Sequence, residues 1–174
     1  SRNFGAFNSV FNGMSVSSGD AIIPFFAADL QDPPDVIVSM IKLWEQGYEV
    51  VYGRKIGRDE SRIMQFVRKV YYKLVRKSSN IEMYENVGEF CLIDKKVQQA
   101  LKQFQDYYPY LRGMIASCGF KNTFVDYTWK KRKFGKTSGN FFILLDNGIN
   151  GLISFTNLPM RFCMIVGFII SVIS

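Results

Sequence analysis

Two oxygen-bearing side chains, Asp29 and Gln31, stand two residues apart directly after an apolar run at residues 21–27. Such a run predicts a buried strand, and ligands of open α/β sheets bind beyond the carboxyl ends of strands. In an extended loop, residues two apart can point the same way. Carboxylate and amide oxygens suit Mg²⁺ or Mn²⁺, which take further ligands from substrate phosphates. The spacing therefore allows a metal site; the alternative is a solvated Asp29 beside an Asp32 that caps a helix.

The composition excludes several other kinds of chemistry. The 174 residues include no histidine, which excludes histidine-based triads and histidine metal sites within this sequence. Cys91, Cys118 and Cys163 are odd in number and widely spaced, so they predict neither a zinc site nor a disulfide framework, and they fit a reducing cytoplasm. Any metal should therefore be held by oxygen ligands.

Positive charge is concentrated in two stretches. The chain carries 22 basic and 15 acidic residues, a net charge of +7, and the excess lies in residues 59–77 and 112–136. Clustered positive charge indicates an anionic partner, such as phosphate groups, anionic lipid or nucleic acid; a solvated basic surface is the alternative. One tryptophan, Trp129, within the second stretch is a weak signal for nucleic-acid binding, and we expect no nucleic-acid partner.

Apolar segments alternate with amphipathic ones along residues 1–138, which favours an α/β layer fold. A helix should begin at Asp32, which could cap it, and end at Gly47. Pro24 weakens the first strand prediction, since proline cannot donate a hydrogen bond within a sheet. The other expected elements are strands at residues 21–27, 49–52, 90–93 and 123–129 and helices at residues 4–16, 60–77 and 97–104.

Residues 139–157 have the pattern of an amphipathic helix. We interpret this segment as a helix that lies in a membrane interface; packing on its own domain is the alternative. Its apolar side is formed by Phe142, Leu145, Ile149 and Leu152.

The segment from residue 158 to residue 174 is strongly apolar, and its last part, residues 162–174, carries no charge. A membrane span needs about 20 apolar residues. We interpret the segment as the start of a transmembrane helix that is cut short, with a buried core helix as the alternative. Basic residues that precede a span favour a cytoplasmic location for the domain.

Short motifs along nearly the whole chain form one ordered series. Together they resemble family-two glycosyltransferases of the GT-A fold, and most closely the polyprenyl-phosphate glycosyltransferases, dolichol-phosphate mannose synthase among them. In chain order they are SRNFG (residues 1–5), GD (19–20), ADLQDPP (28–34), GR (53–54), GEFCLIDK (88–95), YLRG (110–113, similar to a turn of the family), RKFGKTS (132–138), ISF (153–155) and LPMR (158–161).

The resemblance implies a Rossmann-like, nucleotide-sugar-binding GT-A domain at residues 1–138 that lacks its first strand. It implies a hexosyl transfer, with inversion, from a nucleotide sugar to a polyprenyl phosphate at the cytoplasmic membrane face, aided by Mg²⁺ or Mn²⁺. Because the start of the family domain is missing, we expect this stretch alone to be inactive.

Individual residues match the family's functional motifs. The resemblance implies catalytic roles for Asp29 and Glu89 and metal ligation by Asp29 and Gln31, although Glu89 could instead be a strand-end acid paired with an arginine. Three departures stand out: Ala27 and Glu89 replace the family's usual aspartates, and Cys91 replaces its usual arginine. The implied phosphate-binding residues are Arg2, Asp29, Gln31, Arg54 and Arg112 for the donor, and Arg132 and Lys136 for the acceptor.

Two other functions stay open at this point. In the first, the acceptor is a saccharide of a cell-surface polysaccharide, and Glu89 acts as the base that its hydroxyl would need. In the second, the chain is an inactive membrane-tethered homologue that lost activity with the aspartate at Ala27. The sequence identifies neither the sugar, the nucleotide nor the lipid, and it leaves a homo-oligomer open.

Overall fold

The computed structural model of the chain comprises two compact units. An α/β unit is formed by Ser1–Glu60 with Tyr84–Lys136, and a second unit by Ser61–Met83 with Thr137–Ser174. The structure describes residues 4–56, 70, 84, 86–104, 109–130, 149 and 158–173.

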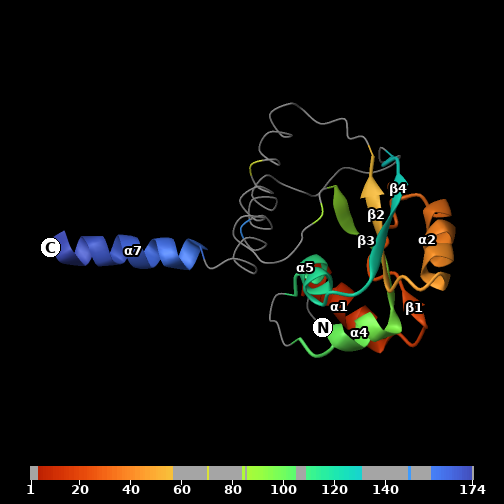
Figure 1. The fold of residues 1–174 in the computed structure, drawn as a ribbon, viewed down its shortest axis with the longest axis horizontal. Helices are drawn as coiled ribbons and strands as arrows, with labels where there is room; N and C mark the ends of the chain where they lie inside the picture. Colours follow the sequence, from red (N-terminus) through yellow and green to blue (C-terminus); the bar gives the residue numbers. More distant parts are fainter. Residues whose placement is uncertain are drawn as a thin grey trace. The chain divides into compact units, whose positions relative to one another are not determined.

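Four strands of the α/β unit form one mixed sheet in the order β1-β3-β2-β4 (Figure 1). β2 and β4 run parallel and pair Lys55 with Tyr127 where both strands end, whereas β3 runs antiparallel to β1 and to β2. The carboxyl ends of β2 and β4 therefore meet at one edge of the sheet. The strands are β1 (Ala21–Ile22), β2 (Val50–Lys55), β3 (Val87–Asp94) and β4 (Asn122–Tyr127).

Helices cover both faces of this sheet (Figure 1). α1 (Ala6–Val16), α4 (Lys95–Leu101) and α5 (Leu111–Ser117) pack on one face, and α2 (Asp35–Glu45) packs on the other. Side chains alternate between the faces: Val50 and Tyr52 belong to the first core cluster and Val51 to the second. Burial on both faces explains why the strands read as continuous apolar runs.

The α/β prediction is confirmed, and its errors have local causes. The strand expected at residues 21–27 is only two residues long, β1, which ends just before the segment that contains Pro24. The helix expected from Asp32 begins at Asp35, and the Asp32 side chain accepts a hydrogen bond from Tyr127 instead of capping the helix. Residues 110–113, which resemble a turn of the family, instead lead into helix α5 at Leu111.

The second unit contributes the described helix α7 (Leu158–Ile173), which has 16 residues. Its described side chains are all exposed, including Phe162, Phe168 and Ile170. No helix among the described residues is both long enough and apolar enough to cross a membrane. The transmembrane segment expected at residues 158–174 is therefore unsupported. The helices expected at residues 60–77 and 139–157 lie outside the described residues, apart from Val70 and Ile149.

Candidate active site

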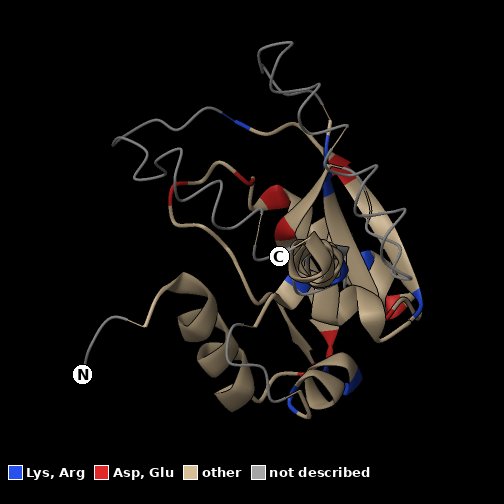
Figure 2. Cartoon of the chain, turned by 90° about the vertical axis from the view of Figure 1, so that its left-hand side faces the viewer, with Lys and Arg blue, Asp and Glu red and all other residues tan. Residues whose placement is uncertain are grey.

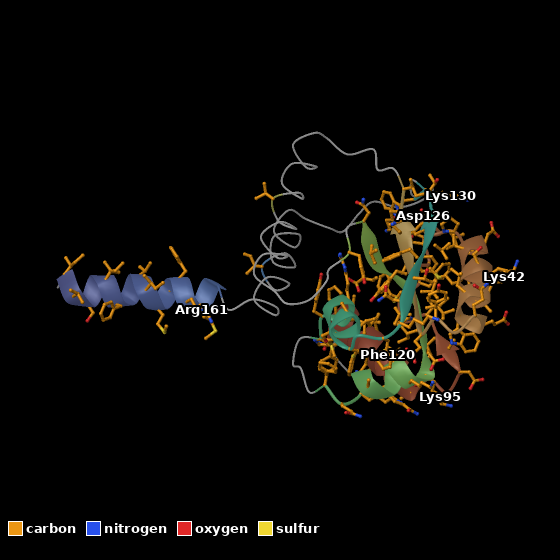
Figure 3. All side chains as sticks on the ribbon, in the orientation of Figure 1. Lys42, Lys95, Phe120, Asp126, Lys130 and Arg161 are labelled. Carbon is orange, nitrogen blue, oxygen red and sulfur yellow. The ribbon has the colours of Figure 1, made fainter. Side chains whose placement is uncertain are left out.

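The acidic segment at residues 28–34 lies beside the chain that leaves β4. The Lys130 backbone N–H donates to the Gln31 carbonyl at 3.0 Å, and the Gln31 side-chain amide donates to the Lys130 carbonyl at 3.3 Å. Asp126 and Lys130 lie at one end of the sheet, and Phe120 lies toward the other (Figure 3). The structure thus confirms the expected position of this segment at the carboxyl ends of the parallel strands.

Asp29 and Gln31 are brought together by a tight turn rather than by an extended loop. The Leu30 N–H donates to the Ala27 carbonyl at 3.3 Å, and the Gln31 N–H donates to Asp29 Oδ1 at 3.2 Å. Leu30 adopts a left-handed conformation with φ of 54°, which is uncommon for a residue other than glycine. The extended loop on which the predicted metal site was based is therefore replaced by a turn, and the convergence of both side chains on one ion stays a prediction.

The donor set of this turn fits a magnesium-like ion. The described residues contain no group of three or more His, Cys, Asp or Glu side chains placed to hold a metal. Magnesium, however, is commonly bound through one or two protein oxygens and completed by water and substrate phosphates. The Gln31 side-chain nitrogen donates to Lys130, which leaves the amide oxygen as the atom able to face a cation.

Asp32 does not cap α2, contrary to the sequence-based alternative. The residue at the N-cap position is Pro34, and no side chain caps the helix. Asp32 is instead 6% exposed, accepts a hydrogen bond from the Tyr127 hydroxyl at 2.5 Å, and lies 3.4 Å from Lys55 Nζ. A buried carboxylate needs such partners because it has lost its water.

Lys55 and Tyr127 are site residues that the sequence reasoning missed. The Lys55 ammonium lies beside Asp32 and 5.2 Å from the centre of the Trp129 ring (Figure 2 shows charges of both signs where the strands end). Strand alternation could have found this lysine, since it is four residues after Val51, which packs on the α2 side of the sheet.

Arg54 lies on the other side of β2. It makes a two-pronged ion pair with Asp126, at 2.5 and 2.8 Å, and its guanidinium lies 5.2 Å from the Phe124 ring centre. Both side chains of the pair are nearly half exposed. The predicted role of Arg54 in binding donor phosphate stays a prediction. Asp126 would compete with that phosphate for the guanidinium.

Glu89, on β3, is partly buried. Burial raises the pKa of its carboxyl above the ordinary value, and the positive charges of Arg112 and Lys55 oppose that shift. Arg112 is itself held by a hydrogen bond to the Tyr84 carbonyl at 2.7 Å. Arg112 thus acts electrostatically on Glu89, while Arg2, Arg132 and Lys136 lie outside the described residues.

Gly53 allows the aromatic layer beneath this site to close. A Cβ atom at this position would lie 2.8 Å from atoms of both the Phe90 and the Tyr127 rings. Those rings meet edge to face, with centres 5.6 Å apart. The glycine of the GR motif thus serves packing under Asp32 and Tyr127.

Comparison with known proteins gives a family match and many relatives. The model of glycosyl transferase family 2 matches residues 1–101. A glycosyltransferase of Synechocystis sp. is 35% identical, over 100% of this chain and 55% of its own length. The prophage bactoprenol glucosyl transferase homolog of Escherichia coli is 32% identical, over 98% and 56% respectively. The bactoprenol glucosyl transferase of Shigella phage SfV is 31% identical, over 99% and 56%. The chain therefore spans about half the length of the curated relatives it matches.

Proposed function

The chain belongs to glycosyl transferase family 2, and we propose that its protein transfers a sugar from a nucleotide sugar to a polyprenyl phosphate. The observation that carries this proposal is the acidic turn at the carboxyl ends of β2 and β4, with Lys55 beside it. Relatives named bactoprenol glucosyl transferases support a lipid acceptor and a glucosyl donor.

Asp29 and Gln31 would hold Mg²⁺ or Mn²⁺. When bound, the ion would offset the charge that develops on the donor diphosphate as the sugar leaves. Lys55 lies 3.4 Å from Asp32, next to this turn, and could add a positive charge for the same diphosphate. The protein thus supplies one oxygen-rich and one cationic contact for a group of high negative charge.

The acceptor needs positioning more than deprotonation. A phosphate monoester is already largely anionic at neutral pH, so it can attack the anomeric carbon directly, with inversion. Arg132 and Lys136 would bind that phosphate, and Arg2, Arg54 and Arg112 would help bind the donor. Glu89 would orient the acceptor or stabilise the developing charge on the sugar.

We also propose that the protein works at the cytoplasmic face of a membrane. α7 presents apolar side chains along its described length, and Phe162 and Phe168 are 69% and 70% exposed. An apolar helix of this kind needs a covering, and a polyprenyl acceptor resides in lipid. A continuation of α7 into a transmembrane helix, and an interfacial helix at residues 139–157, belong to this proposal.

The test uses full-length enzyme in detergent with a panel of nucleotide sugars and polyprenyl phosphate, followed by mass spectrometry of the lipid product. Lys55→Ala and Asp29→Ala should lower transfer at least tenfold. Lys42→Ala is the control, because Lys42 projects from α2 away from the sheet (Figure 3). The absence of a lipid product with every donor would refute the function. Full activity of Asp29→Ala in excess chelator would refute the proposed metal site.

A saccharide acceptor is the second candidate, favoured by one observation. A hydroxyl acceptor requires a general base, and the raised pKa of Glu89 suits that task. The same assay distinguishes the two acceptors when oligosaccharides are supplied in place of the lipid.

A further inference from the structure

The turn that carries Asp29 and Gln31 is anchored from outside itself. Leu30 holds a left-handed backbone conformation although its side chain is 53% exposed, so packing of its own side chain is a poor explanation. A strained backbone conformation persists only when surrounding contacts determine it. Contacts made by other residues must therefore hold this turn.

Asp32 provides the buried anchor on the carboxyl side of the turn. Its carboxylate accepts the Tyr127 hydroxyl at 2.5 Å and lies 3.4 Å from Lys55 Nζ. Asp32 and Tyr127 are 6% and 5% exposed. Since a buried polar group that loses its partner is costly, these contacts fix the Asp32 carboxylate in one place.

Tyr127 is held firmly enough to act as the fixed side of this contact. It is the last residue of β4, paired in register with Lys55, and its ring meets that of Phe90 at an interplanar angle of 85°. The ring belongs to the core cluster between the sheet and α2. Packing therefore locates the ring, and the hydroxyl reaches Asp32.

We propose that Tyr127 is a positioning residue: through Asp32 it holds the turn that presents Asp29 and Gln31 to the metal ion and the donor diphosphate. The inference rests on the proposed function, because it assigns a role within the donor site of that reaction. It adds a residue from the end of β4 to a site otherwise defined by the acidic segment.

The experiment compares Tyr127→Phe with Tyr48→Phe in full-length enzyme. Both variants remove one hydroxyl and keep the ring, but Tyr48 precedes β2 and contacts Lys121 before β4, at the opposite end of the two strands. Hydrogen exchange at the amides of Leu30 and Gln31 reports the turn without reference to activity. The Mn²⁺ concentration that gives half-maximal transfer reports metal binding at the proposed donor site.

Tyr127→Phe should speed exchange at both amides and raise the half-maximal Mn²⁺ concentration, each by roughly tenfold, the usual effect of removing one hydrogen bond to a charged group. The KM for the lipid should stay unchanged, and Tyr48→Phe should resemble the wild type. Asp32→Asn should reproduce both effects, and the double variant should add little, because the two residues act through one contact.

Wild-type exchange at Leu30 and Gln31 in Tyr127→Phe, or an unaltered Mn²⁺ dependence, would overturn the positioning role while leaving the proposed function intact. Additive effects of Tyr127→Phe and Asp32→Asn would show that Tyr127 does not act through Asp32, and would also overturn it. A wild-type enzyme that transfers no sugar would instead refute the proposed function, and the inference with it.

Discussion

Gly53→Ala tests whether the Phe90 and Tyr127 rings pack closely against residue 53 under the site. A Cβ atom at residue 53 would lie 2.8 Å from Phe90 Cδ1, 2.8 Å from Tyr127 Cε1 and 3.1 Å from the Phe90 carbonyl oxygen. Carbon atoms pack best at about 3.5–4.0 Å, so each ring would have to withdraw by roughly 0.7 Å. Neither ring can do so freely, since Phe90 and Tyr127 are 1% and 5% exposed.

The expected cost follows from two opposing terms. Overpacking a well-filled core costs about 1–3 kcal/mol, whereas replacing glycine within a strand regains about 0.5–1 kcal/mol of backbone entropy. The net loss should be about 1–2 kcal/mol. The melting temperature of the variant should fall correspondingly. Displacement of the Tyr127 hydroxyl from Asp32 should also lower the rate of sugar transfer.

Gly88→Ala is the matched control, measured in the same thermal unfolding assay on the full-length protein. A Cβ atom there would meet only Lys55 Cε at 3.6 Å and Nζ at 3.7 Å, which are ordinary contacts. This variant should melt at the wild-type temperature or slightly above it. Equal melting temperatures for Gly53→Ala and Gly88→Ala would refute the packing argument.

Two further predictions concern buried polar side chains. Burial raises the pKa of Glu89 above 4.5, so the folded protein holds this proton more tightly than the unfolded chain, and that stabilising term is lost as the pH rises through the raised pKa. The free energy of unfolding of Glu89→Gln relative to wild type should therefore increase as the pH rises from the ordinary glutamate value of 4.5 through the raised pKa, with the exposed Glu45→Gln as the control variant; a flat difference for Glu89→Gln would contradict the assigned burial. Gln98 is 1% exposed and donates to the Met14 and Ser17 carbonyls at 2.5 and 2.9 Å, so Gln98→Leu should cost about 1–3 kcal/mol by urea unfolding, and a loss no larger than that of the exposed Gln99→Leu would argue against this role.

The order of elements could be predicted from the sequence because each strand has its own apolar run. β2, β3 and β4 were expected from residues 49–52, 90–93 and 123–129, and each is found there. The sheet order β1-β3-β2-β4 depends on pairings between distant segments, which no local pattern contains. The register also shifts between Tyr52 and Arg54 opposite β3, and an irregularity of this kind decides where side chains point.

The acidic turn could be anticipated because Asp29 and Gln31 are neighbours in sequence, and their roles stay predictions. It was missed where the partner lies far along the chain, as in the contact of Asp32 with Tyr127, 95 residues away. Local reasoning assigned Asp32 to a helix cap because that is the commonest use of an aspartate before a helix. The buried alternative could be recognised only once β4 had been placed beside the acidic segment.

The turn itself explains how the chain can have alanine at residue 27, where the family usually has an aspartate. In this structure Ala27 contributes its carbonyl oxygen, which accepts the Leu30 N–H at 3.3 Å, and that contact does not depend on the side chain. The fold of the turn is therefore compatible with the loss of the first carboxylate. Metal binding would then depend on Asp29 and Gln31, and their placement depends on the contacts that hold Leu30 in its left-handed conformation. If the proposed metal binds here, a site with fewer protein oxygens would rely more on its supporting residues, and the proposed anchoring contact between Asp32 and Tyr127 would matter more than it would beside a second aspartate.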